Sequence, residues 1–264
     1  MHHKRKDYRH KGCLYRLAAI FLSTTCLANP VYATDDQIQD DWTFTIAPYL
    51  WGSSLAGTVA TIPGLPPVEV DASFGDIWDN LEAAGMIVGN ARKGRWGVTG
   101  DLQYIKLENA TDALAPAFGT ATAKATNKVF SLSAENLLAN DDSSELWGSA
   151  GLRYWSVDTS LNLAAGDNPA VSASGEDSWI DPVIGLRGRV DMSDAVYLTG
   201  WAYAGGFGAG SESMFDLFGA VGYQFTPVTS AVIGYRWMSV DRQNGSFVYD
   251  VEMKGLMAGL SFTF

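Results

Sequence analysis

The residue types that most often carry catalysis or bind metals are confined to the start of this chain. All three histidines (His2, His3 and His10) and both cysteines (Cys13 and Cys26) lie within the first 26 of 264 residues. Beyond them, a histidine base, a Ser–His or Cys–His nucleophile, a disulfide and a Cys or His metal site are excluded. Any chemistry there would have to use carboxylates, tyrosine, lysine or bound cations.

The first 33 residues indicate a secretory signal peptide. Six basic residues within 1–16 precede the apolar run 17–22, and residues 31–33 form the small-x-small pattern of a cleavage site before Thr34. Ala28 offers a second cleavage point. Lipidation at Cys26 is disfavoured because the residues before it lack the expected leucine and small residue.

The remaining segment, 34–264, is expected to be one acidic domain. It holds 12 basic and 28 acidic residues, a formal net charge of −16, which argues against sequence-independent nucleic-acid binding. Much of the charge is clustered in segments expected to form termini, turns and loops. These clusters could take divalent cations, but no spaced ligand motif is present and solvated charge is favoured. The clusters comprise Asp35, Asp36, Asp40, Asp41, Glu69, Asp71, Asp76, Asp79, Glu82, Asp141, Asp142, Glu145, Asp167, Glu176 and Asp177.

Hydrophobic residues alternate with small or polar ones through most of this domain. The last segment is the clearest, with Leu256, Ala258, Leu260, Phe262 and Phe264 on one face of a strand. Similar segments, several of about nine to eleven residues, have the length that a tilted strand needs to cross hydrocarbon. The predicted strands are 42–51, 84–92, 96–107, 122–138, 145–161, 178–190, 195–205, 215–225, 230–240 and 247–264.

Alternation fits either a soluble sandwich or a membrane barrel. Aromatic residues at the ends of the apolar rows, small residues on the opposite face, and tight turns alternating with longer connections (109–119 and 162–177) favour the barrel. The predicted fold is all-β, a transmembrane antiparallel up-and-down β-barrel. Ten strands are preferred, twelve would result if 58–62 and 68–72 also span, and eight is the smaller alternative.

Three local features complete the fold prediction. Residues 74–82 predict a short helix, capped by Ser73 or Asp76, that is either a plug or an ordinary helix packed on the rim. The segment 197–203 could face either way. A change of apolar face near Gly255 predicts a β-bulge.

Four sequence stretches resemble known outer-membrane barrels. The C-terminal strand, with Leu260, Phe262 and the final Phe264, is similar to the recognition signal of the barrel-assembly machinery. Residues 46–51, 73–81 and 91–97 resemble a family of uncharacterised proteobacterial barrels, close in size to the OmpA and OmpW types. The resemblance implies insertion in the outer membrane of a Gram-negative cell and brings no catalytic residue with it.

The polar faces of the predicted strands place eight charged residues in the barrel lumen. Four acids and four arginines are more typical of an internal salt-bridge network than of an ion-selective constriction. The eight are Asp101, Glu135, Arg153, Asp181, Arg187, Arg189, Asp216 and Arg236.

The sequence thus predicts a non-enzymatic outer-membrane barrel without a cofactor, either a structural and interaction protein of the envelope or a narrow porin-like channel. Its expected partners are outer-membrane lipid, lipopolysaccharide and the barrel-assembly machinery. The alternatives are a lipid-modifying enzyme with a mechanism that does not use histidine, and a soluble periplasmic ligand binder.

Overall fold

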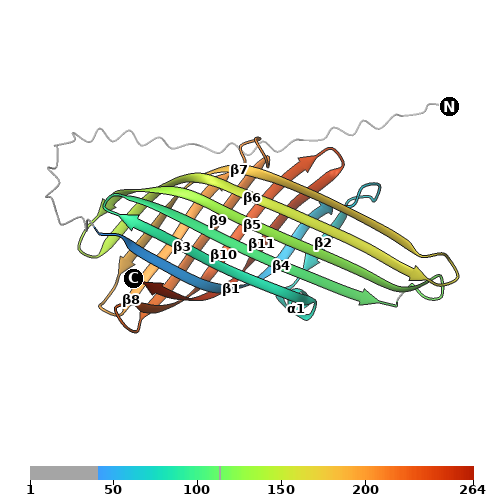
Figure 1. The fold of residues 1–264 in the computed structure, drawn as a ribbon, viewed down its shortest axis with the longest axis horizontal. Coiled ribbons are helices and arrows are strands. Elements are labelled where there is room, and N and C mark those ends of the chain that lie inside the picture. The colour runs from blue at the N-terminus through green and yellow to red at the C-terminus, as the bar shows by residue number, and fades with distance from the viewer. Residues whose placement is uncertain (1–40, 113) are drawn as a thin grey trace, which may run out of the picture. The chain divides into compact units, whose positions relative to one another are not determined.

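A computed structural model describes residues 41–112 and 114–264, so the predicted signal peptide and Asp35, Asp36 and Asp40 lie outside the described residues. The described chain forms an antiparallel β-barrel (Figure 1). Strand β11 closes the ring on β1, with Ile46 opposite Phe262 and Ala60 opposite Val248. The ring strands are β1 (Thr43–Ala60), β3 (Leu81–Lys93), β4 (Trp96–Thr111), β5 (Phe118–Asn140), β6 (Ser144–Ala165), β7 (Val171–Asp191), β8 (Val196–Gly205), β9 (Ser213–Gln224), β10 (Thr229–Asn244) and β11 (Phe247–Thr263).

The preferred count of ten barrel strands is confirmed for the described residues. The first predicted strand, 42–51, continues without interruption to Ala60. Strand β2 (Val68–Ala72) pairs only with the far part of β1, from Leu55 to Val59, so it forms a hairpin rather than a further spanning strand. The connection between β1 and β2 holds three prolines, which cannot donate to a central ladder.

The predicted tight turns lie at one end of the barrel, but the two predicted long loops are shorter than expected. Strand β4 continues to Thr111 and β5 begins at Phe118, while only five residues separate β6 from β7. The missed strand ends are rich in Ser, Thr, Ala and Gly, as in Val171–Gly175, and carry no large apolar row. Ladder pairs such as Leu161 with Ala173 show that backbone pairing continues there.

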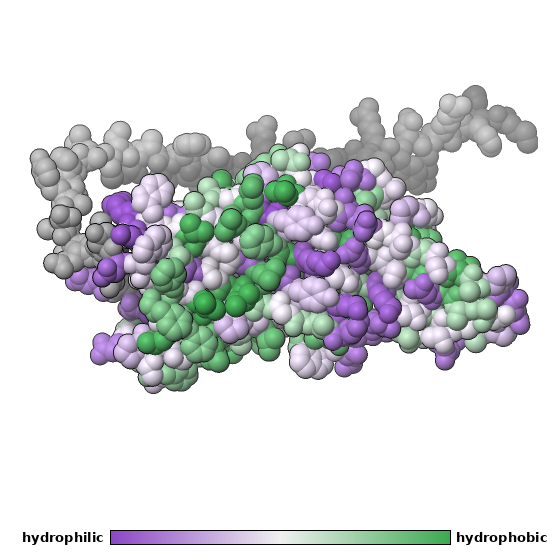
Figure 2. Space-filling view, viewed as in Figure 1, coloured by the Kyte–Doolittle hydropathy of each residue, from purple (hydrophilic) through white to green (hydrophobic). Residues whose placement is uncertain are grey.

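The half of the barrel with the tight turns, here called the belt half, carries its apolar side chains on the outside. Figure 2 shows this surface, which gathers over the half that contains the C-terminus. Every ring strand contributes to it. Representative side chains exposed by at least 41% are Leu50, Ile87, Leu102, Leu132, Leu152, Ile184, Leu198, Leu217, Ile233 and Leu256.

The other half, here called the loop half, is the part of the barrel between these residues and the longer connections. There the apolar side chains are inside: Trp155, Trp179, Phe247 and Tyr249 pack together as a buried aromatic cluster. Charged residues cover the outside and form cross-strand ion pairs such as Lys106–Glu82, Lys124–Glu108 and Lys128–Asp158.

This exchange of faces corrects the prediction of a bulge near Gly255. The ladders of β11 with β1 and with β10 run through Gly255 without a shift, where it lies opposite Ser53 and Arg236. Odd-numbered residues of β11 face inward on both sides of Gly255. The apolar side chains therefore change face there, while the backbone register does not change.

The short helix α1 (Phe74–Asp79) connects β2 to β3. It is shorter than the predicted 74–82, because Leu81 already belongs to β3. Ser73 caps it: its Oγ accepts from the N–H of Asp76, whose carboxylate accepts in return from the Ser73 N–H, a capping box. The hydrogen bonds from Ser73 lower the pKa of Asp76. Among residues 41–112 and 114–264, no helix has the length and hydropathy needed to cross a bilayer.

Candidate functional site

A buried ion pair between neighbouring strands lies at the centre of the lumen. Arg236 on β10 holds Asp216 on β9 with two parallel hydrogen bonds, Nε to Oδ1 at 2.9 Å and Nη2 to Oδ2 at 2.8 Å. Both side chains are 0% exposed. Such a fork matches guanidinium to carboxylate in geometry as well as in charge.

Arg153 reaches the same carboxylate from β6, which is separated from β9 by β7 and β8. Its Nη2 donates to Asp216 Oδ2 at 2.8 Å, and its Nε donates to the Ser131 hydroxyl at 2.8 Å. Its third nitrogen, Nη1, lies 3.4 Å from the sulfur of Met214 and 3.3 Å from that of Met238. Asp216 therefore joins β6 to β9 and β10 across the lumen.

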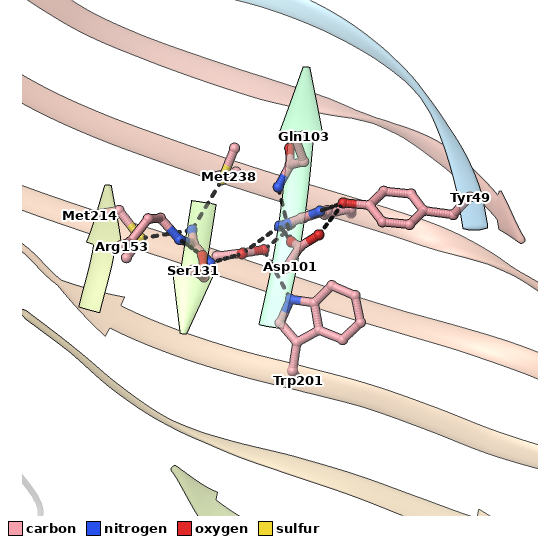
Figure 3. A network of polar contacts seen from close by, with 10 residues as sticks. Tyr49, Asp101, Gln103, Ser131, Arg153, Trp201, Met214 and Met238 are labelled. Carbon is pink, nitrogen blue, oxygen red and sulfur yellow. Dashed lines mark hydrogen bonds and ion pairs between the residues drawn. The ribbon is translucent and has the colours of Figure 1, made fainter. Parts of the chain in front are cut away.

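Asp101 supplies the second acid of this group. It accepts from the Tyr49 hydroxyl at 2.7 Å and from Gln103 at 3.0 Å, and lies 3.4 Å from Arg236 Nη2. Trp201 donates its indole N–H to Asp216 at 3.0 Å. Two acids and two arginines thus form a set with no net charge. Together with Tyr49 they are here called the central network, which comprises Tyr49, Asp101, Arg153, Asp216 and Arg236 (Figure 3).

The central network lies in a layer of buried, inward-facing side chains. Each ring strand except β8 contributes a buried inward side chain at or near this level, and β8 contributes Trp201 through its hydrogen bond. The buried side chains are Trp51, Met86, Gln103, Val129, Arg153, Asp181, Asp216, Arg236 and Met253. If a water-filled passage ran along the barrel axis, side chains of this layer would be exposed to that water.

A second polar cluster lies nearer the tight turns. The fully buried Glu135 accepts from Arg92 Nη2 at 3.1 Å, Asn90 at 3.0 Å and Thr99 at 2.7 Å, and Arg92 also pairs with Glu145 at 2.9 Å. The sequence prediction missed Arg92. Alternation along β3 contains the signal, because Arg92 shares its face with Met86 and opposes the outward Ile87.

Asp181 binds a connection rather than an arginine. Its carboxylate accepts from the backbone N–H of Ser211 at 2.6 Å, the Ser211 hydroxyl at 2.9 Å and the Trp179 indole at 3.3 Å. Arg242 donates to the carbonyl of Gly210 and pairs with Asp177 on β7. The segment between β8 and β9 is thus held against the inner wall of β7.

The other two predicted lumen charges contact aromatic rings rather than the acids of the central network. The Arg187 guanidinium lies 5.5 Å from the centre of the Trp201 ring, and Arg189 pairs with Asp191 at 2.8 Å while stacking on Tyr197. Tyr197 is buried against Ser230. Tyr197 and Trp201 therefore face inward, which settles the orientation of these members of the segment 197–203 that the sequence left open.

The predicted assembly residues lie on the last strand of the ring and at its end. Leu260 and Phe264 are exposed on the outside, and Phe262 lies opposite Ile46 where β11 closes on β1. Among the acidic residues of the described chain, no group of three or more is placed to hold a metal ion together.

Two open grooves lie on the outer face of the belt half. They have volumes of about 880 and 730 Å³ and are lined mostly by outward-facing apolar residues. In the larger one, Gly188, Gly200 and Gly219 are direct neighbours across β7, β8 and β9. Because glycine has no side chain, the outer surface is recessed at these three positions.

Comparison with known proteins bears on the fold. No protein-family model and no curated protein matches this sequence. Among solved structures, the outer membrane protease OmpT from Escherichia coli superposes with a TM-score of 0.53 at 12% identity, covering 86% of this chain and 98% of that one. The transport unit of the autotransporter AIDA-I from E. coli gives a TM-score of 0.40 at 8% identity, with coverage of 90% and 95%.

This chain has the fold of a bacterial outer-membrane β-barrel. The similarity to OmpT confirms the predicted fold class and the resemblance to small outer-membrane barrels. At 12% identity it reaches no further than the fold.

Proposed function

We propose that this protein is a closed, non-enzymatic barrel of the outer membrane, acting as a structural and interaction protein of the envelope rather than as a pore. The observation that carries the proposal is the central network. Asp216 is 0% exposed and is held by Arg153 and Arg236 from different sides of the lumen.

The outward apolar belt supports the membrane location. A row of exposed leucine and isoleucine side chains on every ring strand would be costly in water, whereas lipid removes that cost. The strands are joined by hydrogen-bonded ladders in a closed ring, in which β11 pairs with β1, as a strand-built span requires. Lipid and lipopolysaccharide are the partners that this surface fits.

The charge balance supports a structural role for the lumen. A selective pore uses charges of one sign facing water, but here two arginines and two acids neutralise one another within hydrogen-bonding distance. Burying one such charge alone would cost several kcal/mol, so the members stabilise the native barrel only as a set.

The non-enzymatic assignment rests on composition. Residues 34–264 contain neither histidine nor cysteine, so the usual nucleophile and base pairs cannot be built from them. Proteolysis belongs to OmpT and is not transferred to this chain by a shared fold. The interaction role draws support from strands β5, β6 and β7, which run on beyond the belt half and present a polar outer surface.

Single-channel recording tests the closed lumen. The purified protein is reconstituted in a planar bilayer beside a general porin, with insertion checked by flotation on vesicles and by the heat-dependent gel shift of a folded barrel. We expect an electrically silent wild type. The matched variant combines Asp101→Ala, Arg153→Ala, Asp216→Ala and Arg236→Ala, which removes the two acids and the two arginines together and leaves none of them unpaired, and it is expected to conduct.

Stable conductance of the wild type, altered by Arg236→Ala but not by Arg189→Ala, would overturn the closed barrel in favour of a narrow channel. Partition of the folded protein into the aqueous phase without detergent would instead support the soluble alternative. Release of fatty acid from lipid A or phospholipid would establish the lipid-modifying enzyme.

A further inference from the structure

The barrel wall has a seam between β1 and β3. The two strands pair from Thr43 opposite Arg92 to Pro48 opposite Ile87, and the pairing stops there. Farther along β1, the neighbour on this side is β2, beginning at Leu55. From residue 49 to 54, the described chain gives β1 no ladder partner on this side.

Helix α1 lies over this seam on the outer surface. The ring of Phe74 rests on Gly52 of β1 so closely that a Cβ at Gly52 would meet its Cε2 at 2.9 Å. Gly52 faces outward, since it lies two residues beyond Leu50 and directly opposite Leu256. Leu50 and Leu256 are 63% and 64% exposed members of the apolar belt.

The helix directs apolar side chains away from the barrel as well as onto it. Phe74 and Trp78 are 47% and 58% exposed, and their ring centres are 5.8 Å apart. Asp76 and Asp79 fall on the opposite side of the turn. The Ser73 capping box fixes where this short amphipathic turn begins.

The level of α1 matches the edge of the belt. On β11, the outward side chain after Leu256 is Lys254, which pairs with Glu252 at 2.6 Å, so the charged surface begins within two residues. The aromatic pair therefore lies where the apolar surface meets the charged one. Tryptophan and other amphipathic rings favour this level of a membrane, because part of the ring sits in hydrocarbon and part near water.

We propose that α1 is an interfacial anchor, which inserts Phe74 and Trp78 into the lipid at the outer edge of the belt and covers the seam between β1 and β3. The occupant of this surface is the upper part of the lipid acyl chains. The proposal rests on the membrane location proposed above, and its basis is continuity of the Phe74–Trp78 surface with Leu50 and Leu256.

Site-directed spin labelling tests the anchor. Cys13→Ser and Cys26→Ser give a full chain without cysteine, because no other cysteine is present. Single cysteines are then introduced as Trp78→Cys for the helix, Asp79→Cys for its opposite face, Leu256→Cys for the belt and Leu65→Cys for the exposed β1–β2 connection. Each is labelled with a nitroxide in phosphatidylcholine vesicles, and collision rates with oxygen and with a water-soluble nickel chelate are compared.

We expect the oxygen-to-nickel ratio at position 78 to exceed that at position 65 several-fold and to approach that at 256, with position 79 closer to 65. Brominated acyl chains should also quench wild-type tryptophan fluorescence more than that of Trp78→Phe. Trp155→Phe is the matched control, because Trp155 is 0% exposed and its replacement should leave the lipid-quenched part unchanged.

The outcomes separate the two proposals. Lipid contact at 256 together with water contact at 78 overturns the anchor alone. Protection of position 78 from both collision partners also overturns it, since the ring would then be covered by protein. Water contact at 256 overturns the membrane location itself.

Discussion

The belt half and the loop half are built from the same strands with opposite arrangements of apolar residues. Along β11, Leu256 and Leu260 point outward in the belt half, whereas Tyr249 and Val251 point inward in the loop half. The ladder is continuous between them. The comparison teaches that the backbone does not set which face is apolar, and the proposed membrane location explains the exchange, because lipid would surround the belt half and water the loop half.

The interiors differ for the same reason. In the loop half, water outside drives apolar side chains inward, and Trp155 stacks on Trp179 as in the core of a soluble protein. In the belt half, the apolar residues lie on the outside, so the lumen holds polar groups that must satisfy one another. Asp216 with its two arginines is the result.

The largest expected effect is loss of the central carboxylate. Asp216→Asn leaves Arg153 and Arg236 without their shared counter-charge, and should lower the free energy of unfolding by about 3–5 kcal/mol. Urea titration in lipid vesicles, followed by tryptophan fluorescence, measures it. The matched control is Asp158→Asn, which removes the exposed pair with Lys128 and should cost about 0–1 kcal/mol. Equal losses of stability in the two variants would contradict the prediction that a buried lumen charge depends on its partner more than an exposed charge does.

The aromatic core of the loop half should respond to truncation like a soluble core. Trp155→Ala removes a side chain that is 0% exposed and should cost about 3–5 kcal/mol, with a cavity left behind. Tyr154→Ala, on the outer face of the same strand, should cost less because the ring is 40% exposed. The same titration measures both, and a larger loss at Tyr154 would reverse the assigned inside and outside.

Insertion of a charge should sharpen the boundary between the halves. Leu152→Arg places a guanidinium in the lipid-facing belt and should cost about 2–4 kcal/mol. Asn162→Arg, outward on the same strand but in the loop half, should change stability by no more than about 0.5 kcal/mol. Unfolding from vesicles gives both values. Similar costs at positions 152 and 162 would contradict the proposal that lipid surrounds the belt half and water surrounds the loop half.

The smallest effect is expected from pH at a tight turn and at α1. Hydrogen bonds from Ser143 and Ser144 lower the pKa of Asp141 in a tight turn, as Ser73 does for Asp76 at α1. A lowered folded-state pKa means that the stabilisation is present above the ordinary value of about 3.9 and is lost as pH falls through the folded value.

Hydrogen exchange should therefore show the Ser143 and Ser73 amides equally protected at pH 7 and 5, after correction for the intrinsic rate, and less protected below about pH 4. Asp141→Asn should remove this dependence in the turn while leaving it at α1. Protection that increases on acidification would contradict the assigned hydrogen bonds.

The prediction of the fold succeeded where alternation involved large side chains. The segment 215–225 corresponds to β9 (Ser213–Gln224), and its alternating faces match the exposed Leu217 and the buried Asp216. It fell short at Val171–Gly175, because small and polar residues resemble a loop when no large apolar row marks the outer face. Near Gly255 it interpreted the change of apolar face as a β-bulge, whereas the register is continuous there.

For the site, alternation predicted that Asp216, Arg153 and Arg236 share the lumen, but it could not choose their partners. Arg187 and Arg189 satisfied the same pattern and lie elsewhere, while Arg92, which pairs with Glu135, was missed. Strand order alone does not say which side chains meet across a closed ring.

The sequence by itself determined the strand periodicity, the closed up-and-down order and the inward direction of the charged residues, because side-chain direction repeats every two residues along a strand. Only the tertiary structure decided that Asp216 lies between two arginines, that the apolar face exchanges sides without a bulge, and that α1 covers the end of the β1–β3 ladder. Those features depend on distances across the barrel and on the medium outside it, and neither is a property of a single strand.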